Sequence, residues 1–326
     1  MRGCLAIRGM KRAAGMSAMV AAAMLPVGCA TAKSTAAPQD IRIAGSRVFP
    51  ESITSDAAGN IYTGSTGGTI YRATPGAKEA VAWIVPSAAN GLKSLFGVFA
   101  DDARGLLWAC SNPNLFKQPR EEGVSSLKAF DLATGALKAS YDFPAGPAAC
   151  NDIAIARDGT TYATETAGGR IFRLAPGASA LTLFASGKDL VGVDGIAIAD
   201  DGTIYINNVR QNLLQRVDRK ADGSYAGLTT LQASLALGGP DGLRAIGGNR
   251  FLQAENMAGR VALVTIDGDR ATIVPIRTGL NSAAVTRVGD TAYAPDGKIQ
   301  YLIDPKLKGQ DPDPFLIHAF PIPEQP

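Results

Sequence analysis

At 326 residues the chain is long enough to bury a large hydrophobic core. Its formal charge is +3, but four basic residues lie in an acid-free N-terminal segment, and without them the charge falls to about −1. No cluster of Lys and Arg with interleaved aromatic residues occurs, which argues against nucleic acid or an anionic membrane surface as a partner.

The first residues, 1–32, are expected to be an export signal. A basic stretch from Arg2 to Arg12 precedes the short apolar run AAGMSAMVAAAMLPVG, which is typical of the hydrophobic part of a signal. Two processing routes stay open. The segment 25–29 resembles a bacterial lipobox, in which Cys29 would carry a lipid anchor to the outer membrane. Alternatively, ordinary cleavage follows residue 32. Both routes predict an exported, periplasmic protein with 33–44 as a tether.

A phrase of alternating apolar residues around an Asp-Gly or Gly-Asn turn recurs along the rest of the chain. Strong copies occupy 51–72, 151–174, 194–217 and 241–264, a weaker copy occupies 97–110, and a sixth begins at residue 281. The copies begin 40 to 54 residues apart, which is the period of a propeller blade and not of a helical solenoid unit. The repeat predicts an all-β fold over 45–326, a six-bladed β-propeller with four-stranded antiparallel blades around a central channel.

Further strands follow the copies. Apolar alternation predicts third strands at 69–74, 170–175, 213–218 and 260–265, and fourth strands at 80–85, 181–186 and 271–276. The segment 111–126 is predicted to be a long loop that caps one face. The C-terminal segment 315–323 is expected to pair with 41–49 and close the ring, because an open end would leave an unpaired strand edge.

The residues that open the copies are candidates for a functional site. In a propeller the first strand of each blade lines the channel, so openers in register form a ring at its mouth. The openers are Glu51, Gly97, Asn151, Asp194, Asp241 and Asn281. Their carboxylate and amide oxygens favour Ca²⁺, with Mg²⁺, Mn²⁺ or Zn²⁺ as alternatives. The competing interpretation is that these residues cap strand ends or form turns.

Two cysteines, Cys110 and Cys150, lie beyond the signal segment. Cys110 ends a predicted strand and Cys150 immediately precedes an opener, so contact between neighbouring blades would allow a disulfide in an exported protein. Two buried free thiols are the alternative. The one histidine, His318, is expected to have a structural or surface role.

Three phrases, CNDIAIARDG (150–159), GVDGIAIADDG (192–202) and GPDGLRAIGG (239–248), resemble blade openings of the family of gluconolactonase, senescence marker protein and luciferin-regenerating enzyme. Paraoxonase and diisopropyl fluorophosphatase are relatives of that family. The resemblance covers about residues 45–305. It implies a six-bladed propeller that binds a divalent cation, usually Ca²⁺, and hydrolyses lactones or phosphoesters.

The resemblance also implies a ligand set. The family binds its cation through a Glu, two Asn and an Asp, and the matching residues here are Glu51, Asn151, Asp194 and Asp241. Asp194 stands in place of the second Asn, which adds a negative charge that should tighten cation binding and weaken the pull of the metal on substrate. Ser52-Ile53 stand where the family usually has Gly-Pro, and the histidine pair of the paraoxonase branch has no counterpart.

The function implied is metal-assisted hydrolysis of a small-molecule lactone or related ester by a monomer, with Asp241 as the general base. GxSxG and HExxH patterns are absent. Polar residues expected near the substrate, each also an ordinary strand-end residue, are Asn281, Asn112, Glu165, Asn207, Asn208, Glu255 and Asn256. The alternative is a non-catalytic exported propeller that binds a small ligand or protein partner around a structural Ca²⁺. Lyase or isomerase chemistry at the same site is a third possibility.

Overall fold

The computed structural model describes residues 38–324, except 118, 120, 145–147 and 308. The expected signal segment, the lipidation candidate Cys29 and the first part of the tether therefore lie outside the described residues. Within the described part, no helix is long and apolar enough to cross a membrane.

Antiparallel sheets of four strands make up most of the chain. Three of them are β6(Ser94–Asp101)-β7(Leu106–Asn112)-β8(Ser126–Asp131)-β9(Leu137–Asp142), β10(Cys150–Ile155)-β11(Thr161–Glu165)-β12(Arg170–Leu174)-β13(Thr182–Ser186) and β14(Val193–Ile198)-β15(Ile204–Asn208)-β16(Leu213–Arg219)-β17(Tyr225–Thr230). A fourth sheet runs β19(Pro240–Gly247)-β20(Arg250–Glu255)-β21(Arg260–Asp267)-β22(Arg270–Thr278), with the short β18(Gln232–Ala233) parallel to β22.

The remaining strands form one eight-stranded sheet that joins the two ends of the described chain. Its order is β2(Pro50–Ser55)-β3(Ile61–Ser65)-β4(Ile70–Ala73)-β5(Glu79–Ile84)-β1(Ile41–Ile43)-β25(Phe315–Pro321)-β24(Thr291–Pro295)-β23(Thr286–Val288). Short helices occur at η1(Lys188–Leu190) and α1(Gln300–Ile303). These elements confirm an all-β protein built of four-stranded antiparallel sheets.

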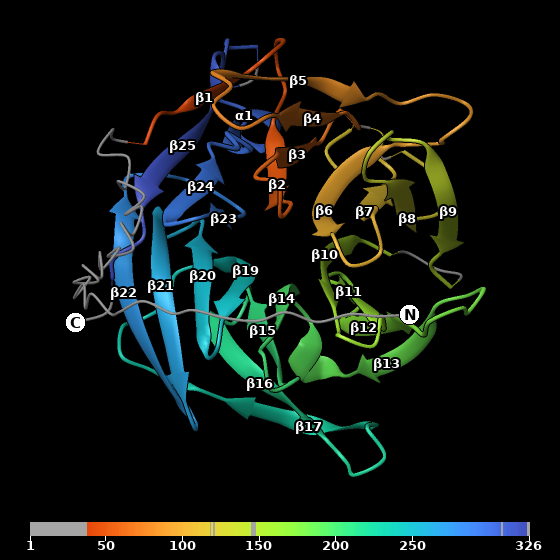
Figure 1. Cartoon of the computed structure of the whole chain (residues 1–326), viewed down its shortest axis with the longest axis vertical. Helices are drawn as coiled ribbons and strands as arrows, with labels where there is room; N and C mark the ends of the chain where they lie inside the picture. The colour runs from red at the N-terminus through yellow and green to blue at the C-terminus, as the bar shows by residue number, and fades with distance from the viewer. Residues whose placement is uncertain (1–37, 118, 120, 145–147, 308, 325–326) are drawn as a thin grey trace, which may run out of the picture. The chain divides into compact units, whose positions relative to one another are not determined.

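The sheets stand around a common centre, and the strands β2, β6, β10, β14 and β19 lie innermost (Figure 1). Burial follows this arrangement. Inner strand β6 is buried along nearly its whole length, whereas the outer strand β9 alternates between half-buried and exposed residues. Apolar side chains from neighbouring sheets pack together, as Phe143, which follows β9, does against Phe172 of β12 with ring centroids 5.0 Å apart. The hydrophobic core therefore lies between neighbouring sheets, and the inner strands surround the centre.

The ends of the folded region pair as the sequence predicts. Ile41 of β1 lies opposite Ile317 of β25 in an antiparallel ladder, and β1 also pairs in parallel with β5. The sheet thus begins at Ile41, before the expected boundary at residue 45. His318 lies beside this junction, where its Nδ1 is 2.8 Å from an Asp40 carboxylate oxygen. The histidine therefore has a structural role away from the central cavity.

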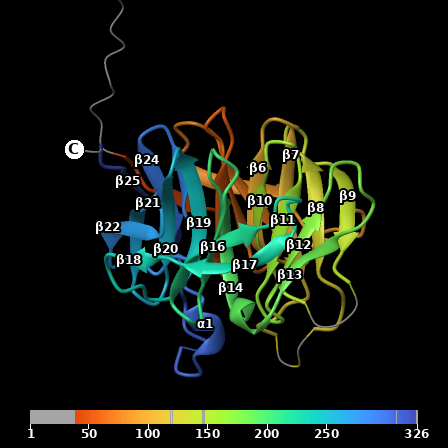
Figure 2. The same cartoon turned by 90° about the horizontal axis from the view of Figure 1, so that it is seen from below.

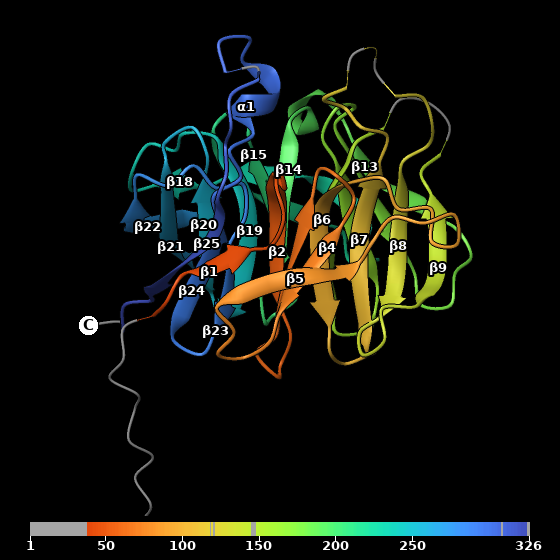
Figure 3. The same ribbon diagram turned by 90° about the horizontal axis from the view of Figure 1, so that it is seen from above.

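Two segments rise on the same face of the structure. The turn that contains α1 projects from this face (Figure 2), and the connection between β7 and β8 projects from the same face (Figure 3). Ile299 from the first segment and Leu115 and Phe116 from the second line the same cavity. The loop predicted over 111–126 therefore contributes a wall to this face.

Candidate functional site

Each of the inner strands β2, β6, β10, β14 and β19 has an irregularity near its start. The ladder register shifts between Pro50 and Ser52, Leu95 and Val98, Cys150 and Ile153, Val193 and Ile196, and Pro240 and Leu243. A bulge leaves residues out of the ladder and re-aims their side chains. The bulged residues Glu51, Asn151, Asp194 and Asp241 all line one cavity of about 380 Å³ at the centre.

The sheet of β6 to β9 has a different opener from the Gly97 expected from the sequence. Its bulge contains Phe96 and Gly97, and Phe96 lines the cavity. A Cβ atom on Gly97 would lie 2.2 Å from the carbonyl oxygen of Asn151, and a Cβ on Gly195 would meet the Asp241 carbonyl oxygen at the same distance. Gly97 is therefore the counterpart of Gly195, the residue after an opener, and Phe96 is the true opener.

The sixth copy needs a similar correction. The amide of Gly242 donates a 2.7 Å hydrogen bond to the carbonyl oxygen of Ala283, so Ala283 takes the opener position of that copy. Asn281 precedes it, outside any strand, and still lines the cavity. The ring position is thus polar in four copies and apolar in two, Phe96 and Ala283.

The polar residues of the cavity are connected by hydrogen bonds. Asn151 Nδ2 donates to Thr166 Oγ1 at 2.7 Å and to Asp194 Oδ2 at 2.9 Å. The carboxyl groups of Asp194 and Asp241 are hydrogen-bonded to each other, and Asn256 Nδ2 donates to Asp241 Oδ2. Because both amide protons of Asn151 are used, its side-chain oxygen is the atom left to bind a ligand.

Three carboxyl groups share this buried space. Burial, with like charge from Asp194 and Asp152, raises the pKa of Glu51 well above its usual range. Burial also raises the pKa of Asp194 to about 7, and burial with the charges of Asp194 and Glu51 raises the pKa of Asp241 well above normal. Within the described residues, Lys and Arg side chains form no ion pair with these three acids.

The charge of Asp152, which lies next to the ring, is balanced differently. Its carboxylate lies 3.5 Å from the Arg244 guanidinium and accepts hydrogen bonds from the amides of Ile153 and Ile196. Burial raises the pKa of Asp152, and Arg244 opposes that shift. Arg244 therefore offsets part of the charge of Asp152, whereas Glu51, Asp194 and Asp241 have no such partner among the described residues.

The donor set fits a hard divalent cation. Carboxylate and amide oxygens are the ligands of Ca²⁺, and a cation would relieve repulsion that otherwise forces the acids to hold protons. The described residues contain no group of three or more His, Cys, Asp or Glu side chains already arranged to hold a metal ion. Binding would therefore use the Asn151 oxygen and replace the hydrogen bond between Asp194 and Asp241.

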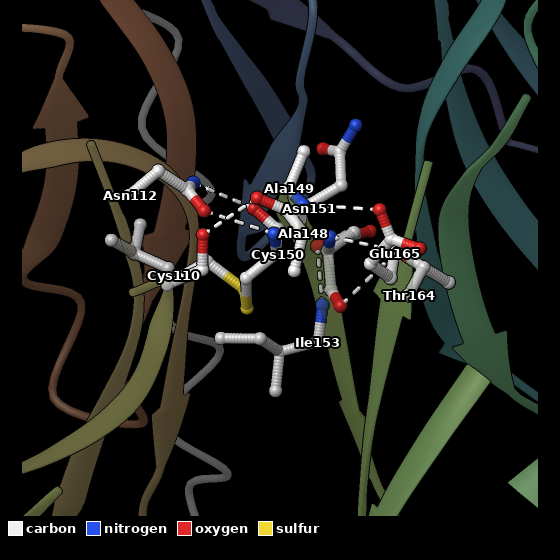
Figure 4. The surroundings of a disulfide bond; sticks show 12 residues. Cys110, Asn112, Ala148, Ala149, Cys150, Asn151, Ile153, Thr164 and Glu165 are labelled. Carbon is white, nitrogen blue, oxygen red and sulfur yellow. Dashed lines mark hydrogen bonds between the residues drawn. A yellow bond between two sulfur atoms is a disulfide. The ribbon is translucent and has the colours of Figure 1, made fainter. Parts of the chain in front are cut away.

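The structure places three expected substrate contacts outside the cavity. Asn112 donates to the Cys150 carbonyl oxygen and accepts from the Cys150 amide, so both ends of its amide hold β10 (Figure 4). Asn208 accepts hydrogen bonds from the amides of Arg210 and Gln211 in the turn after β15. Glu255 is fully buried and pairs with Arg260 at 2.7 Å. These side chains form hydrogen bonds with backbone groups or an ion pair with an arginine. The expectation that they contact substrate is therefore corrected.

Two other strand-end candidates also have structural partners, and a third lies in the site. Glu165 pairs with Arg170 at 2.8 Å, and Asn207 Nδ2 donates to the Asp241 carbonyl oxygen at 2.8 Å. Asn256, in contrast, lines the cavity and contacts the Asp241 carboxylate. The sequence did not single out Thr166 or the Asp152–Arg244 pair, because neither belongs to the opener pattern.

A disulfide lies directly beneath this site. Cys110 of β7 is bonded to Cys150 of β10, with Cα atoms 5.2 Å apart. Figure 4 shows the bridge next to Asn151, the residue that follows Cys150. Because the bond joins two neighbouring sheets, it fixes the start of β10 against β7 and so restrains the ring position of Asn151.

Comparisons with known proteins agree with this fold. Residues 39–73 match the model of the strictosidine synthase-like N-terminal family. No curated protein sequence matches the chain significantly. Among solved structures, the Malassezia sympodialis allergen Mala s 1 aligns with a TM-score of 0.66 and 16% identity, over 87% of this chain and 96% of that one.

Two further solved structures belong to the family that the sequence resembles. A luciferin-regenerating enzyme aligns with a TM-score of 0.63 and 14% identity, over 87% of this chain and 95% of that chain. A gluconolactonase aligns with a TM-score of 0.60 and 16% identity, over 88% and 94%. At these identities the likeness establishes a shared propeller-type fold, and the resemblance seen in the sequence is confirmed at that level.

Proposed function

We propose that this chain is a divalent-metal-dependent hydrolase that acts on a lactone or related ester at the central cavity of a six-bladed β-propeller. The observation that carries the proposal is a group of three carboxyl groups, those of the buried Asp194 and Asp241 and of the half-buried Glu51, which face one cavity without a cationic partner among the described residues. A surplus of buried negative charge of this kind calls for a cation, and Ca²⁺ suits its oxygen donors.

The strand order supports a count of six blades. The eight-stranded sheet contains two four-stranded groups, β2 to β5 and β1-β25-β24-β23, which meet only through the short parallel pairing of β5 with β1. These two groups and the other four sheets supply the six ring positions. The positions are Glu51, Phe96, Asn151, Asp194, Asp241 and Ala283.

The residues of the site support hydrolysis in distinct ways. A bound divalent cation would supply a Lewis acid that polarises an ester carbonyl group. Asp241, ionised beside a cation, would take a proton from the attacking water, and Asn256 would hold its carboxylate in place through the Nδ2 hydrogen bond. Asn151 would offer its side-chain oxygen to the cation while its amide group stays bound to Thr166 and Asp194.

Export is the second part of the proposal. The Cys110–Cys150 disulfide supports it, because disulfides persist in the periplasm and are rare in the cytosol. A cell fractionation of the full chain would test it, with the protein expected in the periplasmic or outer-membrane fraction. Recovery in the cytosol alone would contradict export.

A screen of lactones and aryl esters tests the hydrolase proposal. The metal-free protein would be assayed with EDTA, with Ca²⁺ and with Mn²⁺. We expect hydrolysis that requires a cation and is lost in EDTA. If the protein binds Ca²⁺ and hydrolyses none of the esters, the cation is structural and the chain is a binding protein.

A further inference from the structure

The cavity has an apolar side as well as a polar one. Inner strands follow one another in the order β2, β6, β10, β14 and β19, so Asn151, Asp194 and Asp241 occupy consecutive ring positions. Phe96 and Ala283 flank Glu51 on the other side of the ring. Asn151, Asp194 and Asp241 therefore face a side of the ring on which Glu51 stands between two apolar positions.

The connection between β7 and β8 extends this apolar side upward. Leu115 and Phe116 line the cavity, and the Phe116 ring lies 6.1 Å from the Phe96 ring. Both side chains pack on the buried cluster that contains Phe96 and the disulfide. Asn114 holds the turn, since its side-chain oxygen accepts the Phe116 amide at 2.9 Å. Leu115 and Phe116 thus form an apolar wall that is packed against the core.

This wall is a poor match for a polyhydroxylated lactone. A sugar hydroxyl buried without a hydrogen-bond partner loses its hydration at a cost, and Phe96, Leu115 and Phe116 offer no side-chain partner. The other polar side chains that line the cavity, among them Thr166, Arg210 and Asn281, come from other segments than this wall. The volume of about 380 Å³ is at the low end for small-molecule sites, so it suits one ring with a modest substituent.

We propose that the substrate is an apolar one: an alkyl- or aryl-substituted lactone or ester whose hydrocarbon group packs between Phe96 and Phe116 while its carbonyl group faces Asp194 and Asp241. That the ligand is hydrolysed rests on the proposed function. That the ligand is apolar rests on the apolar wall alone. Each methylene group buried against the wall should improve kcat/KM about fourfold until the space is filled.

The test is a series of γ-lactones with substituents from methyl to hexyl, assayed with Ca²⁺ beside gluconolactone. We expect kcat/KM to rise with chain length and gluconolactone to be at least about 100-fold poorer than the best alkyl lactone. Phe116→Ala should lower kcat/KM for the hexyl lactone roughly 10- to 100-fold and leave the methyl lactone within about threefold. Leu183→Ala, at an exposed position that does not line the cavity, is the matched control and should change neither.

Equal or better hydrolysis of gluconolactone would overturn the inference, and so would an equal loss for both lactones in Phe116→Ala. Binding of the matching alkyl lactams, followed by calorimetry, separates this inference from the proposed function. If no lactone is hydrolysed but lactam affinity rises with chain length and falls in Phe116→Ala, the hydrolase proposal fails and the apolar site stands. Absence of lactam binding, or binding indifferent to chain length, contradicts the apolar site.

Discussion

The side-chain amide of Asn151 donates a 2.9 Å hydrogen bond to Oδ2 of Asp194, which lies 43 residues further along the chain and in the next sheet. The contact joins two ring positions across the boundary between β10 and β14. It also orients the amide, because the same nitrogen donates to Thr166. The Asn151 side chain, whose oxygen we propose binds a cation, is thus held in place by its neighbours.

Asp241→Asn should abolish most hydrolysis while it only weakens cation binding. Asn keeps an oxygen donor but cannot accept a proton from water, and loss of a general base typically costs about 10²–10⁴-fold in rate. Steady-state kinetics at saturating Ca²⁺ would measure the effect. The matched variant Asp194→Asn also removes one negative charge, yet we expect weaker cation affinity with activity retained or raised. Equal activity of both variants and the unaltered protein would place the chemistry elsewhere.

The cation-free protein should become less stable as the pH rises. In the folded state burial raises the pKa of Asp194 to about 7, whereas an unfolded chain has an Asp pKa of about 3.9. Between these values the folded state binds more protons, so the free energy of unfolding falls as the pH increases and the contribution is lost above about pH 7. The raised pKa values of Glu51 and Asp241 act in the same direction.

Urea unfolding in EDTA at pH 5 and pH 8 would measure this dependence. Ca²⁺ should stabilise the protein more at pH 8, where protons no longer compete for the carboxylates. Asp194→Asn should flatten the dependence, because the amide does not titrate. A cation-free protein that is more stable at pH 8 than at pH 5 would show that these acids are not the dominant titrating groups.

Removing the Cys110–Cys150 disulfide should destabilise the fold and loosen the site. The bond closes a loop between residues 40 apart, and loss of such a bond costs about 2–4 kcal/mol. The double variant Cys110→Ala/Cys150→Ala avoids a leftover thiol and should unfold at lower urea. Cation affinity should also fall, because Asn151 follows Cys150 directly. An unchanged unfolding midpoint in the double variant would be inconsistent with this role.

Gly195→Ala should disrupt the ring more than its size suggests. A Cβ at this position would lie 2.2 Å from the Asp241 carbonyl oxygen and 2.6 Å from the Leu243 amide nitrogen, so β14 and β19 would have to separate. We expect a large loss of stability and of cation affinity. Gly187→Ala is the control, since no atom lies within 4 Å of its added Cβ. Similar unfolding midpoints for the two variants would argue against close packing of the inner strands.

Local pattern was enough to predict most strands. The predicted strands at 170–175 and 181–186 correspond to β12 (Arg170–Leu174) and β13 (Thr182–Ser186), because alternation and turn residues are local signals. Closure of the ring by 315–323 was also predicted correctly, since it follows from the need to pair a strand edge.

Two features of the site could not be predicted from local sequence patterns. The opener of the second copy is Phe96 and not Gly97, because the position depends on a bulge that packs Gly97 against the backbone of Asn151. Asn112, Asn208 and Glu255 sit at strand ends as Asn256 does, yet they face buried backbone or an arginine. The direction of a strand-end side chain is set by tertiary partners, and the sequence around it does not record them.

Calorimetric titration of the metal-free protein with Ca²⁺ tests directly whether Glu51, Asn151, Asp194 and Asp241 together hold one divalent cation. Wild-type protein should bind one ion per chain, and the double variant Asp194→Ala/Asp241→Ala, shown by circular dichroism to be folded, should lose that binding. Absence of binding to the wild-type protein, or equal affinity and stoichiometry in the folded double variant, would show that these four residues do not form a cation site.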